Sequence, residues 1–119
     1  MKTKKGILID VVNKTVTEVE IKSSKTLKEM YRVIGCSMVE CVNIDPKNDL
    51  WVDEEGLLTV TENTRSFNCG GHYLIGNGLI LGFNPKKGES CDTTLTVNQV
   101  KEMVKFIDEV DTRKILMEM

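Results

Sequence analysis

The sequence predicts an α+β fold, in which two helices pack on one face of a mostly antiparallel sheet of about five or six strands. Three observations predict this class: the 119-residue length suits one domain, short apolar segments alternate with turn residues, and two segments have the periodicity of amphipathic helices. We place a single domain in residues 1–110. Residues 111–119 are expected to form a tail or an extension of the last helix.

The N-terminal third predicts a β-hairpin followed by a helix. Residues 6–11 and 15–22 are rich in β-branched side chains and flank a tight connection at Asn13–Lys14. In residues 23–35, Thr26 and Glu29 have the spacing of a capping box, and Gly35 suits a left-handed C-terminal cap. The apolar stripe of this helix consists of Leu27, Met30, Tyr31 and Ile34.

The middle of the chain predicts strands joined by turns. Residues 37–44 alternate as a strand, and Asp45–Pro46 starts a turn. Residues 50–52 and 57–60 flank Asp-Glu-Glu-Gly, which predicts a second hairpin with Gly56 available for a positive φ.

The remaining segments complete the predicted sheet and its second helix. Residues 61–68 are expected to form a loop or a short helical turn. Residues 78–83 are apolar on both faces, so we expect a strand at the centre of the sheet. Residues 95–110 predict the second helix, with Thr96 and Gln99 spaced as a capping box. Its expected buried stripe is Val97, Val100, Val104 and Ile107.

The charge and hydropathy patterns exclude some classes of protein. The formal net charge is −2 and the isoelectric point is about 5.5, whereas a binder that relies on phosphate contacts usually has a basic excess. The lysines are spread along the chain, so we read them as solvating and expect no nucleic-acid partner. No apolar run is long enough to span a bilayer. We therefore expect no membrane association, a location in the cytoplasm and reduced thiols.

Several stretches in order resemble a known family. They are Gly6–Ile21, Leu27–Ile44 with its Val-Ile-Gly-Cys step, Asp49–Leu58, Ile75–Gly82 and Leu95–Ile107. The combination is similar to a small domain family of unknown function that is carried by phages, plasmids and other mobile elements. The resemblance implies a cytoplasmic accessory protein, often encoded near anti-restriction genes, and implies no established reaction. His72 and the short spacer before Gly76 depart from the family pattern.

Residues 68–84 hold five of the nine glycines and the only histidine. The favoured interpretation is structural: turns at the glycines, and a bulge or a close approach at Gly82. The alternative is a ligand-facing loop, because glycines let backbone amides approach an anion closely. The spacing matches neither a P-loop nor a dinucleotide fingerprint. The candidate ligand-binding residues are Gly70, Gly71, His72, Tyr73, Gly76, Asn77 and Gly78.

The cysteines and the histidine offer weak evidence for metal binding or catalysis. Cys69 and His72 have half the spacing of a zinc site, but the other cysteines do not form a second close pair. The same two residues could act as nucleophile and base in a small enzyme. Because no acid, base and nucleophile visibly converge, we expect no catalytic residue, no metal and no cofactor.

Two further features are candidate contact surfaces. Trp51 is expected to pack in the core, with an anchor for a partner as the alternative. The apolar C-terminal residues 115–119 predict fraying or docking on a second subunit, which would give a homo-oligomer.

The hypothesis favoured by these patterns is stoichiometric binding without catalysis. The binding partner would be a host protein or a small nucleotide-type ligand, in a counter-defence role implied by the family resemblance. A small enzyme that depends on cysteine and histidine is one alternative. A structural or regulatory subunit with no small-molecule ligand is the other.

Overall fold

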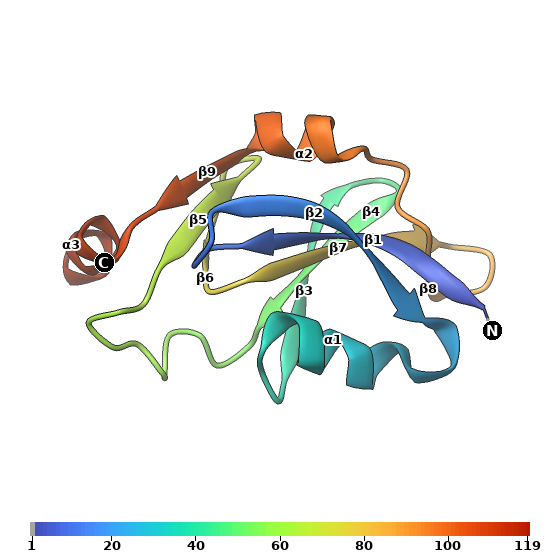
Figure 1. The fold of residues 1–119 in the computed structure, drawn as a ribbon, viewed down its shortest axis with the longest axis horizontal. Coiled ribbons are helices and arrows are strands. Elements are labelled where there is room, and N and C mark those ends of the chain that lie inside the picture. Colours follow the sequence, from blue (N-terminus) through green and yellow to red (C-terminus); the bar gives the residue numbers. More distant parts are fainter. Residues whose placement is uncertain (1) are drawn as a thin grey trace.

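A computed structural model describes residues 2–119, which extend over 42 × 28 × 23 Å. The elements, in chain order, are β1 (Thr3–Asp10), β2 (Thr15–Lys22), the 3₁₀ helix η1 (Ser23–Lys25), α1 (Thr26–Ile34), β3 (Val39–Asp45), β4 (Asn48–Asp53), β5 (Ser66–Cys69), β6 (His72–Ile75), β7 (Gly78–Asn84), β8 (Glu89–Cys91), α2 (Val97–Met103), β9 (Val104–Ile107) and α3 (Glu109–Met117). The two ends of the chain lie at opposite ends of the molecule (Figure 1).

The main sheet has six strands and is antiparallel in every pairing. Its order is β2-β1-β7-β4-β3, and β8 pairs with the end of β7. The predicted hairpin around Asn13–Lys14 is confirmed, as is the turn after Asp45. The prediction that residues 78–83 form a central strand is also confirmed, since β7 lies between β1 and β4. Side chains on both faces of β7 are buried, which explains its continuous apolar run.

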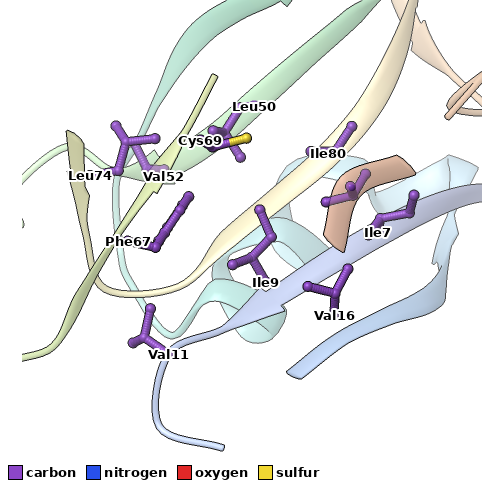
Figure 2. Close-up of a cluster of buried hydrophobic side chains, with 11 residues drawn as sticks. Ile7, Ile9, Val11, Val16, Leu50, Val52, Phe67, Cys69, Leu74 and Ile80 are labelled. Atoms are coloured by element: carbon purple, nitrogen blue, oxygen red, sulfur yellow. The ribbon is translucent and has the colours of Figure 1, made fainter. Parts of the chain in front are cut away.

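The two faces of the main sheet bury separate hydrophobic cores. The first core contains Ile7, Ile9, Leu50 and Ile80, which pack with Phe67 of the small sheet (Figure 2). The second core is on the opposite face and consists of Ile21, Met30, Ile34, Leu79 and Leu81.

The predicted packing of two helices on one face is therefore wrong, although the α+β class is confirmed. α1 supplies Met30 and Ile34 to the second core, whereas α2 supplies Val100 to the first. Figure 1 shows the two helices on opposite sides of the main sheet. The physical reason is that β7 is apolar on both faces, so both faces need a cover.

A small second sheet with the order β6-β5-β9 covers part of the first core. Residues 104–107, predicted as helix, form β9 and pair with β5. Val104 and Phe106 pack against the first core while Lys105 between them is exposed. This two-residue alternation fits the free edge of β5 better than a continued helix would, so tertiary context overrides the helical spacing.

The predicted hairpin of residues 50–52 and 57–60 is also wrong. β4 already pairs with β3 on one side and with β7 on the other, so it has no free edge. Residues 54–65 consequently run from β4 to β5 without a helix or strand. Leu57 and Leu58 remain 62% and 81% exposed. We refer to residues 54–65 as the crossing segment.

Only some of the helix caps predicted from the sequence are present in the structure. The capping box at Thr96 and Gln99 is confirmed, with both reciprocal hydrogen bonds present at 2.9 and 3.1 Å. The expected box at Thr26 and Glu29 is wrong, because α1 begins directly after η1 and has no side-chain cap. Gly35 ends α1 in the left-handed conformation, as predicted.

The C-terminal residues form a docked helix. The Asp108 side chain caps α3 by accepting from the backbone N–H of Asp111 at 2.8 Å. Thr112 of α3 is buried and makes a hydrogen bond to Ser66 of β5. Within residues 2–119, no helix combines the length and the apolar character that crossing a bilayer demands.

Candidate functional site

Two adjoining cavities lie where the crossing segment passes β6 and the start of β7. They share the lining residues Asp53, Gly56 and Ile75, and we refer to the two adjoining cavities together as the cleft. The smaller cavity measures about 110 Å³ and is lined by Glu40, Val52, Glu54, Leu57, Tyr73, Leu74 and Met119 besides the shared residues. The larger measures about 270 Å³, and its other lining residues are Val11, Val12, Ile34, Thr59, Asn63, Thr64, Arg65, Gly76 and Asn77.

Arg65 provides the positive charge that lines the larger cavity. Its Nε donates to Glu109 Oε2 at 2.8 Å, and its Nη1 donates to the Val12 carbonyl oxygen at 2.7 Å. A guanidinium has five N–H donors, so these partners orient it without using its full capacity. The backbone N–H at the start of α3 and the Arg65 guanidinium lower the pKa of Glu109. Arg65 is thus held in place by two elements distant in sequence.

Gly76 and Asn77 form the wall of the larger cavity next to Arg65. The Gly76 N–H donates to the Arg65 carbonyl oxygen at 3.0 Å, which joins the β6–β7 connection to the crossing segment. The Asn77 side-chain oxygen accepts from the Val11 N–H at 2.9 Å. The Asn77 side chain therefore links the β6–β7 connection to the end of β1. Together, the hydrogen bonds of Gly76 and Asn77 fix the position of this cavity wall.

Tyr73 and three carboxylates give the smaller cavity its chemistry. The Tyr73 hydroxyl oxygen is buried and has no hydrogen-bond partner among residues 2–119, and a buried polar group without a partner is costly. Glu40, Asp53 and Glu54 line the same cavity. Carboxylates accept hydrogen bonds and a hydroxyl can donate or accept, so this cavity suits a ligand with N–H or ammonium donors.

The structure separates the predicted ligand-binding residues into three places. Tyr73, Gly76 and Asn77 line the cleft. Gly70 and Gly71 form the tight turn between β5 and β6, where both have a positive φ, and His72 is exposed directly after it. Gly78 lies in the core, where an added Cβ would meet Phe67 Cζ at 2.8 Å and Leu50 Cδ1 at 2.9 Å.

A comparison with protein families matches residues 2–106 to a family described as a domain of unknown function (DUF3846). The chain belongs to this DUF3846 family. The match covers the main sheet, α1, α2 and both cavity walls that come from the crossing segment and β6. Searches of curated proteins and of solved structures find no match.

Three thiols of this DUF3846 domain, those of Cys36, Cys41 and Cys69, are in surroundings that favour the protonated form. Cys69 is fully buried, and burial raises its pKa. Burial and the negative charge of Asp49 raise the pKa of Cys41 to about 11, and burial and Asp53 raise that of Cys36. A thiol is a nucleophile as the thiolate, so these environments work against nucleophilic catalysis. Within residues 2–119, no three His, Cys, Asp or Glu side chains are grouped to hold a metal ion.

Trp51 lies on the face of β4 that points toward α1. It packs against the second core and is partly exposed, and its indole Nε1 is buried without a hydrogen-bond partner among residues 2–119. The Trp51 backbone is opposite Cys41 on β3 and Leu79 on β7. The residue therefore contributes to packing, and its role as a partner contact remains a prediction.

Sequence reasoning missed the residues that complete the cleft. Arg65 is the only lysine or arginine between Lys47 and Lys86, and this isolation in an otherwise uncharged or acidic stretch was a usable signal. Thr59 and Thr64 had no such signal, because their position depends on the path of the crossing segment, and Glu40 had none because it is on β3, far from the rest of the cavity wall in sequence.

Proposed function

We propose that this domain acts by stoichiometric binding of a small nucleotide-type ligand in the cleft, without catalysing a reaction. The resemblance to a domain carried by mobile elements supports a role as a phage or plasmid accessory protein in the host cytoplasm. Sequestering a nucleotide signal would then serve counter-defence. A small protein sequesters a signal when it is abundant and binds the signal tightly, and this requires no catalytic turnover.

The observation that carries the proposal is Tyr73, a residue that lines the smaller cavity and whose buried hydroxyl has no hydrogen-bond partner among residues 2–119. Ligand sites commonly combine apolar walls with a few polar groups that fix orientation. Here Leu57 and Leu74 supply apolar wall, and Glu40 and Asp53 supply acceptors. A ligand atom that pairs with the hydroxyl would remove an unfavourable buried group.

The smaller cavity offers hydrogen-bond acceptors and the larger cavity offers a cation, which suit the base and the phosphate of a nucleotide respectively. A purine or pyrimidine with exocyclic amino or ring N–H groups can donate to the carboxylates of the smaller cavity. The phosphate would face the larger cavity, where the Arg65 guanidinium offers charge-assisted hydrogen bonds. Thr59 and Thr64 add hydroxyl donors there. The acidic smaller cavity would therefore hold the base of the nucleotide, and the cationic larger cavity would hold its phosphate.

The surroundings of Cys69 and His72 support binding over catalysis. Cys69 is in the first core with a raised pKa, whereas His72 is exposed at the β5–β6 turn. General acid–base work needs a group within hydrogen-bond reach of the reacting atoms and a pKa near the working pH. Cys69 and His72 are opposite each other in the β5–β6 register, but no hydrogen bond joins their side chains within residues 2–119, and burial raises the pKa of the Cys69 thiol away from the working range.

The test is a thermal unfolding screen of the whole chain against mononucleotides, dinucleotides and cyclic nucleotides. A ligand at 100 times its dissociation constant adds about 2.7 kcal/mol to the free energy of unfolding. We expect Tyr73→Phe, which removes only the hydroxyl, to reduce the shift given by the best ligand. Arg65→Gln should reduce it further.

The matched control is Tyr31→Phe, which makes the same change in the only other tyrosine, a residue of α1 that lines neither cavity. This variant should keep the full shift. Bound nucleotide recovered after incubation should be chemically unchanged by mass spectrometry. A screen without any shift, or nucleotide conversion that depends on Cys69 or His72, contradicts the proposal.

A second proposal concerns self-association through the C-terminus. Met117 and Met119 are 81% and 77% exposed, and Leu58 of the crossing segment is 81% exposed. Met119 lines the smaller cavity together with Leu57, which places the C-terminus beside the crossing segment. Light scattering on a size-exclusion column should give a dimer or larger assembly that Met117→Glu converts to monomer. A monomeric parent chain contradicts this second proposal.

A further inference from the structure

Four cationic side chains lie close together on the α1 side of the molecule, although they are spread over eleven positions of the sequence. The side chains of Lys22, Lys25, Lys28, Glu29 and Arg32 line one surface concavity of about 410 Å³. Lys22 ends β2, Lys25 ends η1, and Lys28 and Arg32 follow on α1. The structure thereby gathers four cations at one place in a chain whose net charge is −2.

The single carboxylate in this concavity is already engaged. Glu29 Oε2 accepts from Arg32 Nε at 2.8 Å, and the Glu29 side chain also accepts from the Lys22 backbone N–H at 3.4 Å. The ion pairs among residues 2–119 are Arg32–Glu29 and Arg65–Glu109. The ammonium groups of Lys22, Lys25 and Lys28 therefore form no ion pair within residues 2–119, although the charge of Lys22 helps to lower the pKa of Glu29.

Helix stability accounts for Glu29 in the first turn of α1 and for Arg32 in its last turn, but not for the lysines. The N-terminus of a helix favours acidic side chains, since the first N–H groups carry partial positive charge. Lys25 is at the N-cap of α1 and Lys28 in its first turn, and the helix has no side-chain cap. Like charges at a spacing of three residues also repel each other. A local departure from these rules is typical of residues retained for function.

We propose that this concavity binds a compact polyanion made of linked phosphates. Four cations and one carboxylate give this concavity a net charge of +3, which suits two or three linked phosphates better than a single one, and the Arg32 N–H groups that do not contact Glu29 can donate to one of them. The concavity is small and the rest of the chain is acidic, so an extended nucleic-acid strand would leave the cationic area. This site is separate from the cleft and independent of the ligand proposed there.

The experiment measures binding of inorganic tripolyphosphate to the whole chain by isothermal titration calorimetry. The double variant Lys25→Glu with Lys28→Glu should abolish binding and leave the melting temperature of the free protein unchanged or slightly higher, because acidic residues suit the start of α1. Arg65→Gln removes the cation that the nucleotide proposal assigns to the phosphate, and this variant should not alter the affinity for tripolyphosphate. A failure of the nucleotide proposal therefore stays distinguishable from a failure of this one.

The control is Lys86→Glu with Lys87→Glu, which makes the same charge change in the exposed turn between β7 and β8. This control should retain tripolyphosphate binding. Equal loss in both double variants, or no binding by the parent chain, overturns the proposal. Tighter binding of a single-stranded oligothymidylate than of tripolyphosphate, with a salt slope of about −0.7 per contacted phosphate, overturns it in favour of a nucleic-acid surface.

Discussion

The hydroxyl groups of Ser66 and Thr112 are 2.7 Å apart in the interior of the protein, and each side chain is almost completely buried. Thr112 Oγ1 also donates to the Ile107 carbonyl oxygen at 3.3 Å. Because a threonine hydroxyl has one proton, Ser66 must be the donor of the shorter bond. This relay fixes α3 to β5 directly next to Arg65, and so connects the C-terminal helix to the wall of the cleft.

We expect Thr112→Val to destabilise the protein more than Ser66→Ala does. The valine leaves the Ser66 hydroxyl buried without a partner, which costs about 1–3 kcal/mol. Ser66→Ala costs about 0.5–1.5 kcal/mol, because Thr112 keeps its bond to Ile107. Urea unfolding of both single variants and of the double variant measures the coupling. Strictly additive losses would show that the two hydroxyls act independently.

Gly78→Ala should lower the free energy of unfolding by about 1–3 kcal/mol, because the new methyl group overpacks the first core. An added Cβ at this position would lie within 3 Å of atoms of Phe67 and of Leu50. The control is Gly71→Asn at the exposed β5–β6 turn, where asparagine tolerates the positive φ. It should change stability by less than about 0.5 kcal/mol. Unchanged stability of Gly78→Ala in thermal unfolding would contradict the core assignment.

The sequence predicted those elements whose signals are local. β7 was predictable because both of its faces are apolar. α2 was predictable because Thr96 and Gln99 have the spacing of a capping box at its first turn. β9 was missed because Val104 fits a helical stripe equally well, and only the free edge of β5 decides the outcome. The strand expected at residues 57–60 was wrong because β4 has neighbours on both sides, which is a property of the whole sheet.

The cleft was only partly predictable for the same reason. Tyr73, Gly76 and Asn77 were identified from a glycine-rich stretch, and they do line the cavities. Gly70 and Gly71 belong to the same glycine-rich stretch, but they form the turn between β5 and β6. The crossing segment brings Arg65 to this wall through a pairing with Glu109, 44 positions later in the chain. No local pattern encodes such a contact.

Cys41 should react slowly with thiol reagents although its side chain is exposed. Burial of the sulfur and the nearby Asp49 carboxylate raise its pKa from 9.0 to about 11, which lowers the thiolate fraction about 100-fold at neutral to mildly alkaline pH. Iodoacetamide labelling followed by peptide mass spectrometry measures the rate at this residue. Asp49→Asn should accelerate it, whereas Asp45→Asn serves as the control. Parent-chain labelling as fast as that of a free thiol contradicts the raised pKa.

The pairing of Arg65 with Glu109 should make stability depend on pH at the acidic end. The backbone N–H at the start of α3 and the Arg65 guanidinium lower the pKa of Glu109 from 4.5 in the folded protein. A carboxyl whose folded pKa is depressed stabilises the protein above its unfolded pKa, and this contribution is lost as the pH falls through the folded value. We therefore expect Glu109→Gln to reduce the free energy of unfolding near neutral pH. The difference from the parent chain should shrink as the pH falls below the ordinary pKa of a glutamate carboxyl, and it should disappear once the carboxyl is protonated in the folded protein as well. Urea unfolding across this range, with Glu102→Gln of exposed α2 as the control, checks the sign. A deficit in Glu109→Gln that stays constant down to the lowest pH would show that packing, and not the carboxylate charge, holds α3 against the cleft.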